Sequence, residues 1–123
     1  MKILVFGNLL VKKDSLPLRI LPKLKKKFKD IEFKDIDATE ELQAEGRDLV
    51  ILDAVEGIDK VMIIENIDQI KQSKVYSLHD FDLGYNLKLL KKMKLIDSAK
   101  IIGVPMRISE KEALAQIQFI LRK

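Results

Sequence analysis

Three residues of this 123-residue chain, Asp14, Asp53 and His79, carry side chains that can do chemistry together. Each follows a stretch that the sequence predicts to be a strand, and each precedes a loop or a helix. Two carboxylates and the chain's single imidazole form a mixed oxygen and nitrogen donor set, suited to nickel, zinc or ferrous iron. Three ligands leave coordination positions open on such an ion. The sequence therefore indicates a transient or shared metal.

The elements that must position these side chains are predicted strands at residues 2–6 and 48–52 and a weaker one at 74–76. The first two are short continuous apolar runs, typical of parallel strands that are buried on both faces. Ligands of open α/β sheets gather at the carboxyl ends of such strands. We therefore expect the three side chains at one edge of a sheet.

The surrounding sequence contains four motifs in a defined order. They are Gly7-Asn8-x-Leu10 with Asp14 six positions after the Asn, an apolar strand closed by Asp53-Ala54, His79 ahead of a helix, and a last strand at 101–105. In this order and spacing they resemble the hydrogenase maturation endopeptidases, which trim the C-terminal extension from the large subunit of nickel–iron hydrogenases. The resemblance runs from Met1 to about Pro105.

The resemblance implies that Asp14, Asp53 and His79 contact the metal and direct catalysis. In that family the metal is the nickel already inserted in the precursor, so the substrate supplies it, and other divalent metals can substitute. The implied activity is a metal-dependent endopeptidase that recognises nickel in the hydrogenase large-subunit precursor and removes its C-terminal extension. That precursor is the implied partner.

Four further residues are candidates for the loops that face the substrate: Gly7, Asn8, Asp35 and Asp37. The chain departs from the family pattern close to them. Pro17 replaces a glycine, a double acid is reduced to Lys13-Asp14, and residues 35–39 replace a Gly-Gly-Thr loop. Glycine allows a positive φ and a close backbone approach more readily than other residues do. An alternative therefore stays open, a non-catalytic nickel-sensing protein that binds the precursor on the same fold, or a module of unrelated role.

Each metal-site candidate also has an ordinary structural interpretation. Asp14 can cap a helix, and Asp53 can accept hydrogen bonds from a following turn. His79 lies within Ser77-x-x-Asp80, a sequence that can cap the next helix and leave the imidazole exposed. Three independent roles of this kind would have to coincide with the three metal positions of the family. The metal site is therefore the favoured hypothesis.

Composition limits the remaining choices. A chain with 47% hydrophobic and 34% charged residues is ordinary for a globular protein, and we expect a single domain spanning 1–123. No apolar run approaches the roughly 20 residues of a membrane span, and no secretory signal is recognisable, so we expect a cytoplasmic protein without membrane insertion. The absence of cysteine excludes disulfides, thiolate ligands and cysteine nucleophiles.

The basic excess has two interpretations. The net charge is +4, and five lysines cluster in one segment, at 23, 25, 26, 27 and 29. They fall at the end of a predicted helix, where cations favour the helix dipole, and no interleaved aromatic or Arg pattern accompanies them. We therefore expect a solvated face and no nucleic-acid partner, although nucleic-acid binding remains a weaker third hypothesis.

Strand patterns alternate with helical patterns, which predicts an α/β fold. We expect a three-layer α/β/α sandwich with a mainly parallel, five-stranded mixed sheet. Further strands are predicted at 31–37, 60–64 and 98–104, and helices at 15–28, 38–44, 81–93 and from Ser109 to about 121. Apolar stripes should face the core from Leu16, Ile20, Leu21, Leu24 and Phe28, and from Leu83, Leu87, Leu90 and Leu95. Gly46 should end the helix at 38–44, and Ser109 with Glu112 should form a capping box.

Overall fold

A central sheet positions the other elements in the computed structural model, which describes residues 1–6, 16–36, 42–65, 77–78 and 81–122. The main path of the sheet has the order β2-β1-β3-β6-β4. These strands are β1 (Lys2–Val5), β2 (Glu32–Asp35), β3 (Asp48–Glu56), β4 (Met62–Ile64) and β6 (Ser98–Pro105). A two-residue strand, β5 (Ser77–Leu78), pairs with β3 off this path.

The sheet is mixed and mainly parallel. β1 runs parallel to both β2 and β3, and β3 runs parallel to β6 over eight residue pairs, from Asp48–Ser98 to Val55–Pro105. The edge strand β4 is antiparallel to β6, and β5 is antiparallel to the end of β3. The five strands of the main path confirm the predicted sheet.

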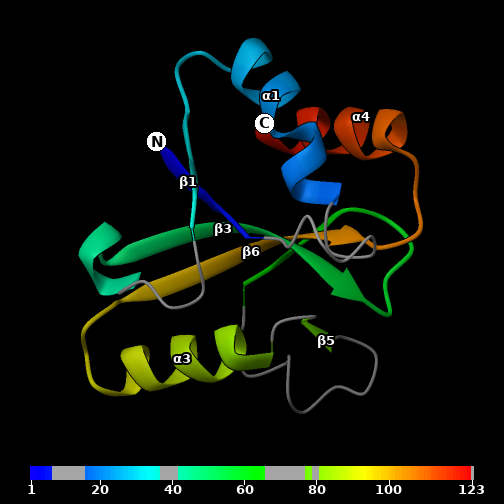
Figure 1. The fold of residues 1–123 in the computed structure, drawn as a ribbon. Coiled ribbons are helices and arrows are strands. Elements are labelled where there is room, and N and C mark those ends of the chain that lie inside the picture. The colour runs from blue at the N-terminus through cyan, green and yellow to red at the C-terminus, as the bar shows by residue number, and fades with distance from the viewer. Residues whose placement is uncertain (7–15, 37–41, 66–76, 79–80, 123) are drawn as a thin grey trace.

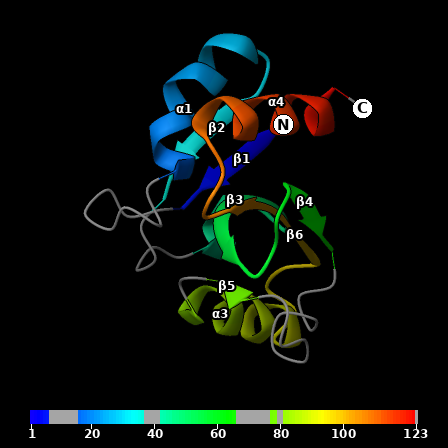
Figure 2. The same cartoon turned by 90° about the vertical axis from the view of Figure 1, so that its right-hand side faces the viewer.

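Helices cover both faces of the sheet (Figure 1). α1 (Leu16–Lys27) and α4 (Glu110–Leu121) lie on one face, and α3 (Phe81–Lys92) lies on the other. The turned view in Figure 2 shows the same three layers, with the sheet between the helices. A short 3-10 helix, η2 (Leu42–Glu45), precedes β3. The predicted three-layer α/β/α sandwich is therefore confirmed.

The core consists of one apolar cluster on each face of the sheet. Successive strand side chains point to opposite faces, so Ile3 and Val5 join the cluster under α1 and α4, whereas Leu4 and Phe6 join the cluster under α3. From Ile3 to Val5, β1 is therefore apolar because it is buried on both sides. β3 contributes Leu52 to the first cluster and Leu49, Ile51 and Val55 to the second.

The predicted apolar stripe of α1 is confirmed. All five of its residues are buried, namely Leu16, Ile20, Leu21, Leu24 and Phe28. Pro22 lies inside the helix with its ring exposed, and the helix continues through it to Lys27. A proline in this place removes one backbone hydrogen bond, and the buried stripe holds the helix against the sheet on the other side.

Several predicted boundaries need correction. Of the polar helix expected at 38–44, residues 38–41 lie outside the described residues; the described part is a 3-10 helix at Leu42–Glu45, and Gly46 follows it at φ +135°. Leu95 was expected in the core, but it is 38% exposed because α3 ends and the chain turns through Lys94 at φ +63°. The strand expected at 74–76 and the start of helix 15–28 at Ser15 lie outside the described residues.

No helix in the described ranges is long and apolar enough to cross a membrane.

Candidate functional site

Asp53 is the buried charged residue of the described chain. The residue is 3% exposed, and every other residue in the described core is apolar. Placing a carboxylate away from water is costly unless a hydrogen bond or a cation compensates it. A carboxylate held in this position is therefore a candidate for function.

Asp53 lies within β3, not beyond its end as the sequence predicted. β1 accompanies β3 only as far as the pair Val5–Leu52, followed by a hydrogen bond of 2.9 Å from the Phe6 N–H to Leu52 O. On its other side β3 continues to pair with β6, which places Asp53 opposite Gly103. The error arose because strand length here depends on β6, which is remote in sequence. Asp53 still lies where its neighbour β1 stops.

The Asp53 carboxylate is fixed by the backbone that follows it. Ala54 N–H donates to Asp53 Oδ1 at 2.9 Å. N–H and C=O groups of alternate strand residues point to the same side, so Ala54 N–H points to the side where Leu52 O receives the bond from Phe6. Beyond β1, the Asp53 side chain satisfies this strand donor itself, and its second oxygen, Oδ2, is buried as well.

Gly103 shapes the surroundings of Asp53. A Cβ at this position would lie 2.9 Å from Val55 Cγ2 and 3.3 Å from Ile58 Cδ1, so the space is already occupied. By strand alternation Asp53 is on the same face as Ile51 and Val55, the face that α3 covers. In the sequence Gly103 falls inside the last predicted strand, at 101–105. A glycine inside a β-branched run was the signal for a close approach.

The other predicted metal ligands, Asp14 and His79, lie outside the described residues, as do Gly7, Asn8 and Asp37. The described residues that directly precede Gly7 and His79 form backbone hydrogen bonds or strand pairs with β3 close to Asp53. Phe6, which precedes Gly7, donates to Leu52 O, and Leu78, which precedes His79, pairs with Val55. Phe6 and Leu78 therefore both contact β3 within two residues of Asp53.

Within the described residues, no group of three His, Cys, Asp or Glu side chains could hold a metal ion. Two of the three predicted ligands, Asp14 and His79, are not among the described residues that this finding covers. Asp53 is the member of the predicted trio that the structure describes, and a buried, oriented carboxylate is chemically suited to a divalent ion.

Asp35, a candidate for substrate contact, is exposed at the end of β2. It is in register with Val5, which is in turn in register with Leu52 of β3. Asp35 and Asp53 are thus at the same edge of the sheet with β1 between them, two strand spacings or about 10 Å apart. Asp35 shares the face of Val5 under α1 and α4, whereas Asp53 is on the face under α3, so the two carboxylates are not placed to ligate one ion together.

The segment at residues 35–39, which was expected to face the substrate, contains a core residue directly after β2. Ile36 is buried, its N–H donates to Val5 O at 3.0 Å, and it packs in the cluster under α3. The first position after β2 is therefore fixed by packing.

Ion pairs occur near the opposite end of the strands. Glu45 accepts hydrogen bonds from Lys2 and Lys34, both at 2.7 Å, and these bonds lower the pKa of its carboxyl group. Arg47 donates to both oxygens of Asp97 at 3.0 Å, which lowers the pKa of Asp97. The first cluster joins η2 to β1 and β2, and the second joins the residues that directly precede β3 and β6. They were not predicted, because they connect residues far apart in the chain.

The fold is similar to two solved structures. The first, the solution structure of an endopeptidase from Escherichia coli, has a TM-score of 0.64 and 21% identity, covering 99% of this chain and 93% of that one. The second, the crystal structure of an uncharacterized protein from Wolinella succinogenes, has a TM-score of 0.59 and 12% identity, covering 98% and 91%. At these identities the likeness establishes the fold alone. No protein-family model and no curated protein matches the chain.

Proposed function

We propose that this chain is an endopeptidase that recognises nickel in the precursor of a nickel–iron hydrogenase large subunit and removes its C-terminal extension. The observation that carries the proposal is the buried Asp53 carboxylate, held by Ala54 N–H at the point where β1 ends. The motif order around Asp14, Asp53 and His79 supports it. The likeness of nearly the whole chain to an Escherichia coli endopeptidase gives coarser support, for peptidase activity.

In this proposal Asp14, Asp53 and His79 occupy open positions on the nickel that the precursor brings. Their role is to hold the scissile bond in place, since positioning converts a bimolecular step into an effectively unimolecular one. The nickel would supply Lewis-acid chemistry for the hydrolysis, by polarising the scissile carbonyl or by activating a water. Asp53 enters this arrangement already oriented, because its Oδ1 is engaged by Ala54 N–H.

A second candidate is a nickel-sensing protein that binds the precursor without cutting it. The buried Ile36 favours this candidate, because it places a fixed core residue where the family has a glycine loop. Residues around Asp35 would then bind the precursor without positioning its scissile bond for cleavage.

The deciding experiment measures the intact mass of a nickel-loaded, tail-bearing large subunit before and after incubation with this protein. Loss of one discrete tail with the wild type, and none with Asp53→Asn or His79→Ala, is the result expected for the endopeptidase. A stable complex without any mass change would select the nickel-sensing protein. If the protein neither cleaves nor binds the precursor, both candidates are refuted.

A further inference from the structure

Basic and exposed apolar side chains occur together at the C-terminal end of α3 and in the turn that follows it. Three large apolar side chains are exposed there, with Leu89 at 41%, Met93 at 58% and Leu95 at 38%. Met93 N–H donates to Leu89 O at 2.9 Å, which places these two residues one turn apart, and Leu95 N–H donates to Leu90 O at 2.9 Å. The three side chains therefore gather around the last turn of the helix.

Four lysines accompany these side chains, at 88, 91, 92 and 94. Residues 83–96 contain no acidic side chain, and the first acid after them, Asp97, is bound at both oxygens by Arg47. The helix dipole accounts for cations at this end, but it does not account for exposed leucine and methionine between them. We refer to the four lysines with Leu89, Met93 and Leu95 as the α3 surface.

We propose that the α3 surface adsorbs to an anionic lipid bilayer. Apolar side chains of an interfacial helix enter the headgroup region, while long lysine side chains reach the lipid phosphates beside them. Among the described elements, α3 is the outer layer on its face of the sheet (Figures 1 and 2). An acidic protein partner would need a matching groove. Adsorption requires no spanning helix, and α3 has 12 residues.

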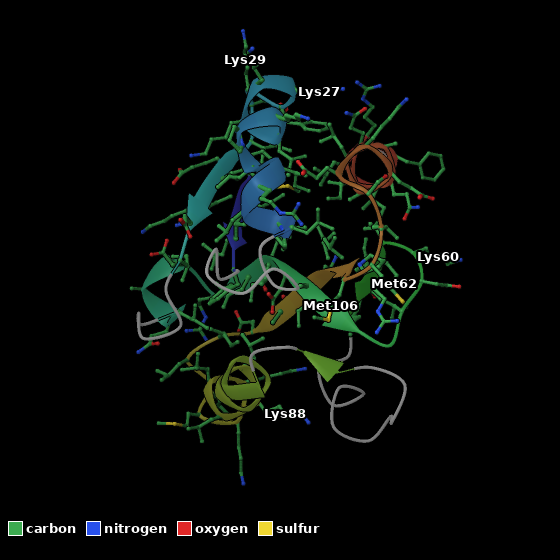
Figure 3. The ribbon with its side chains drawn as sticks, turned by 45° about the vertical axis from the view of Figure 1, so that its right-hand side comes forward. Lys27, Lys29, Lys60, Met62, Lys88 and Met106 are labelled. Atoms are coloured by element: carbon green, nitrogen blue, oxygen red, sulfur yellow. The ribbon has the colours of Figure 1, made fainter. Side chains whose placement is uncertain are left out.

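The end of α1 provides an internal comparison. It carries five lysines, at 23, 25, 26, 27 and 29, yet the large hydrophobic residues found exposed in the described chain include none from α1. Figure 3 shows Lys27 and Lys29 at one end of the molecule and Lys88 at the other. A flat membrane that contacts the α3 surface therefore leaves the α1 lysines in solution, and the two sites can be varied separately.

The test is sedimentation of the full chain with vesicles of phosphatidylcholine mixed with phosphatidylglycerol, and with vesicles of phosphatidylcholine alone. We expect binding to the anionic vesicles that weakens as salt is raised. The pair Lys91→Glu and Lys92→Glu should reduce partitioning about tenfold or more, since each cation near an anionic surface contributes substantially. The pair Leu89→Ser and Met93→Ser should also reduce it, because apolar insertion is lost.

The matched control is the pair Lys26→Glu and Lys27→Glu, which makes the same charge change on α1 and should leave binding within about twofold of wild type. Circular dichroism and thermal melting establish that every variant is folded. Absence of binding to the anionic vesicles, or an equal loss in the α1 pair, would overturn the proposal. So would a dimer in sedimentation velocity that the Leu89→Ser, Met93→Ser pair abolishes, because a second copy would then cover this surface.

Discussion

Gly103 lies directly opposite Asp53 in the parallel pairing of β6 with β3. The glycine allows Val55 and Ile58 to occupy the space where its side chain would be, with the nearest atom only 2.9 Å from an ideal Cβ. The wall beside the buried carboxylate is therefore built by apolar residues from β3 itself and from the turn after it. Gly103 therefore affects both the packing of the core and the surroundings of Asp53.

Replacing Gly103 by alanine should destabilise the protein. The new methyl group would overlap Val55 Cγ2, and overpacking of a core typically costs about 1–3 kcal/mol. Chemical denaturation of Gly103→Ala against wild type measures the loss. If the overlap is the cause, the double variant Gly103→Ala, Val55→Ala should lose less than the sum of the two single variants. If the stability losses of the two single variants add exactly in the double variant, the overlap with Val55 is not the cause.

Asp53→Asn and Asp53→Ala should separate the structural role of this side chain from its chemical one. Asparagine keeps an oxygen that can accept from Ala54 N–H, whereas alanine leaves that donor without its 2.9 Å bond. We expect the alanine variant to be less stable than the asparagine variant by about 1–3 kcal/mol in denaturant unfolding. Both should lose precursor cleavage. Normal cleavage by a folded Asp53→Asn protein would exclude the carboxylate from the mechanism.

Lys94→Gly should stabilise the protein. Lys94 has a φ of +63°, and its N–H bonds to Lys91 O, while the Leu95 N–H bonds to Leu90 O, the arrangement of a Schellman motif at the end of α3. Glycine prefers this position, and after its entropic cost we expect a gain of about 0.5–1 kcal/mol. Thermal melting measures it. Lys88→Gly, inside the helix, is the control and should shift the midpoint in the opposite direction.

The Lys2–Glu45–Lys34 cluster predicts a loss of stability in acid. Hydrogen bonds from Lys2 and then Lys34 lower the pKa of Glu45 from its ordinary value of 4.5. A carboxyl group with a lowered folded-state pKa stabilises the fold fully above its unfolded pKa, and this contribution disappears as the pH falls through the folded value. Unfolding free energies measured from neutral pH to below 4.5 should fall less steeply for Glu45→Gln than for wild type. An identical slope would disprove this role.

The sequence predicted those parts of the fold that local patterns control. The stripe from Leu16 to Phe28 predicted α1 because its period matches one helical face. Ser109 predicted the start of α4, and its Oγ accepts from the Glu112 N–H at 3.1 Å. Continuous apolar runs predicted the inner strands. In each case the signal and the structure involve residues only a few positions apart.

The missed features depend on partners distant in the chain. β3 continues past residue 52 because β6 lies beside it, which no pattern within 48–52 reveals. The exposure of Leu95 depends on a left-handed turn at a lysine, where sequence rules favour glycine. For the site, the sequence selected Asp53 as a residue just past a strand at 48–52, whereas its position inside β3, its burial and the role of Gly103 depend on the pairing of β3 with β6.

The pairing of β3 with β6 also has a consequence for the rate at which the native state forms. Ser98 Oγ donates to Asp48 Oδ1 across a separation of 50 residues, and all eight β3–β6 pairs share that separation. A long loop must close before these contacts contribute, and domains dominated by such nonlocal pairing fold slowly. During synthesis β1, β2 and β3 are complete well before β6 emerges. Until β6 is synthesised, the edge of β3 that pairs with β6 has no partner strand. During this interval the chain is most exposed to aggregation.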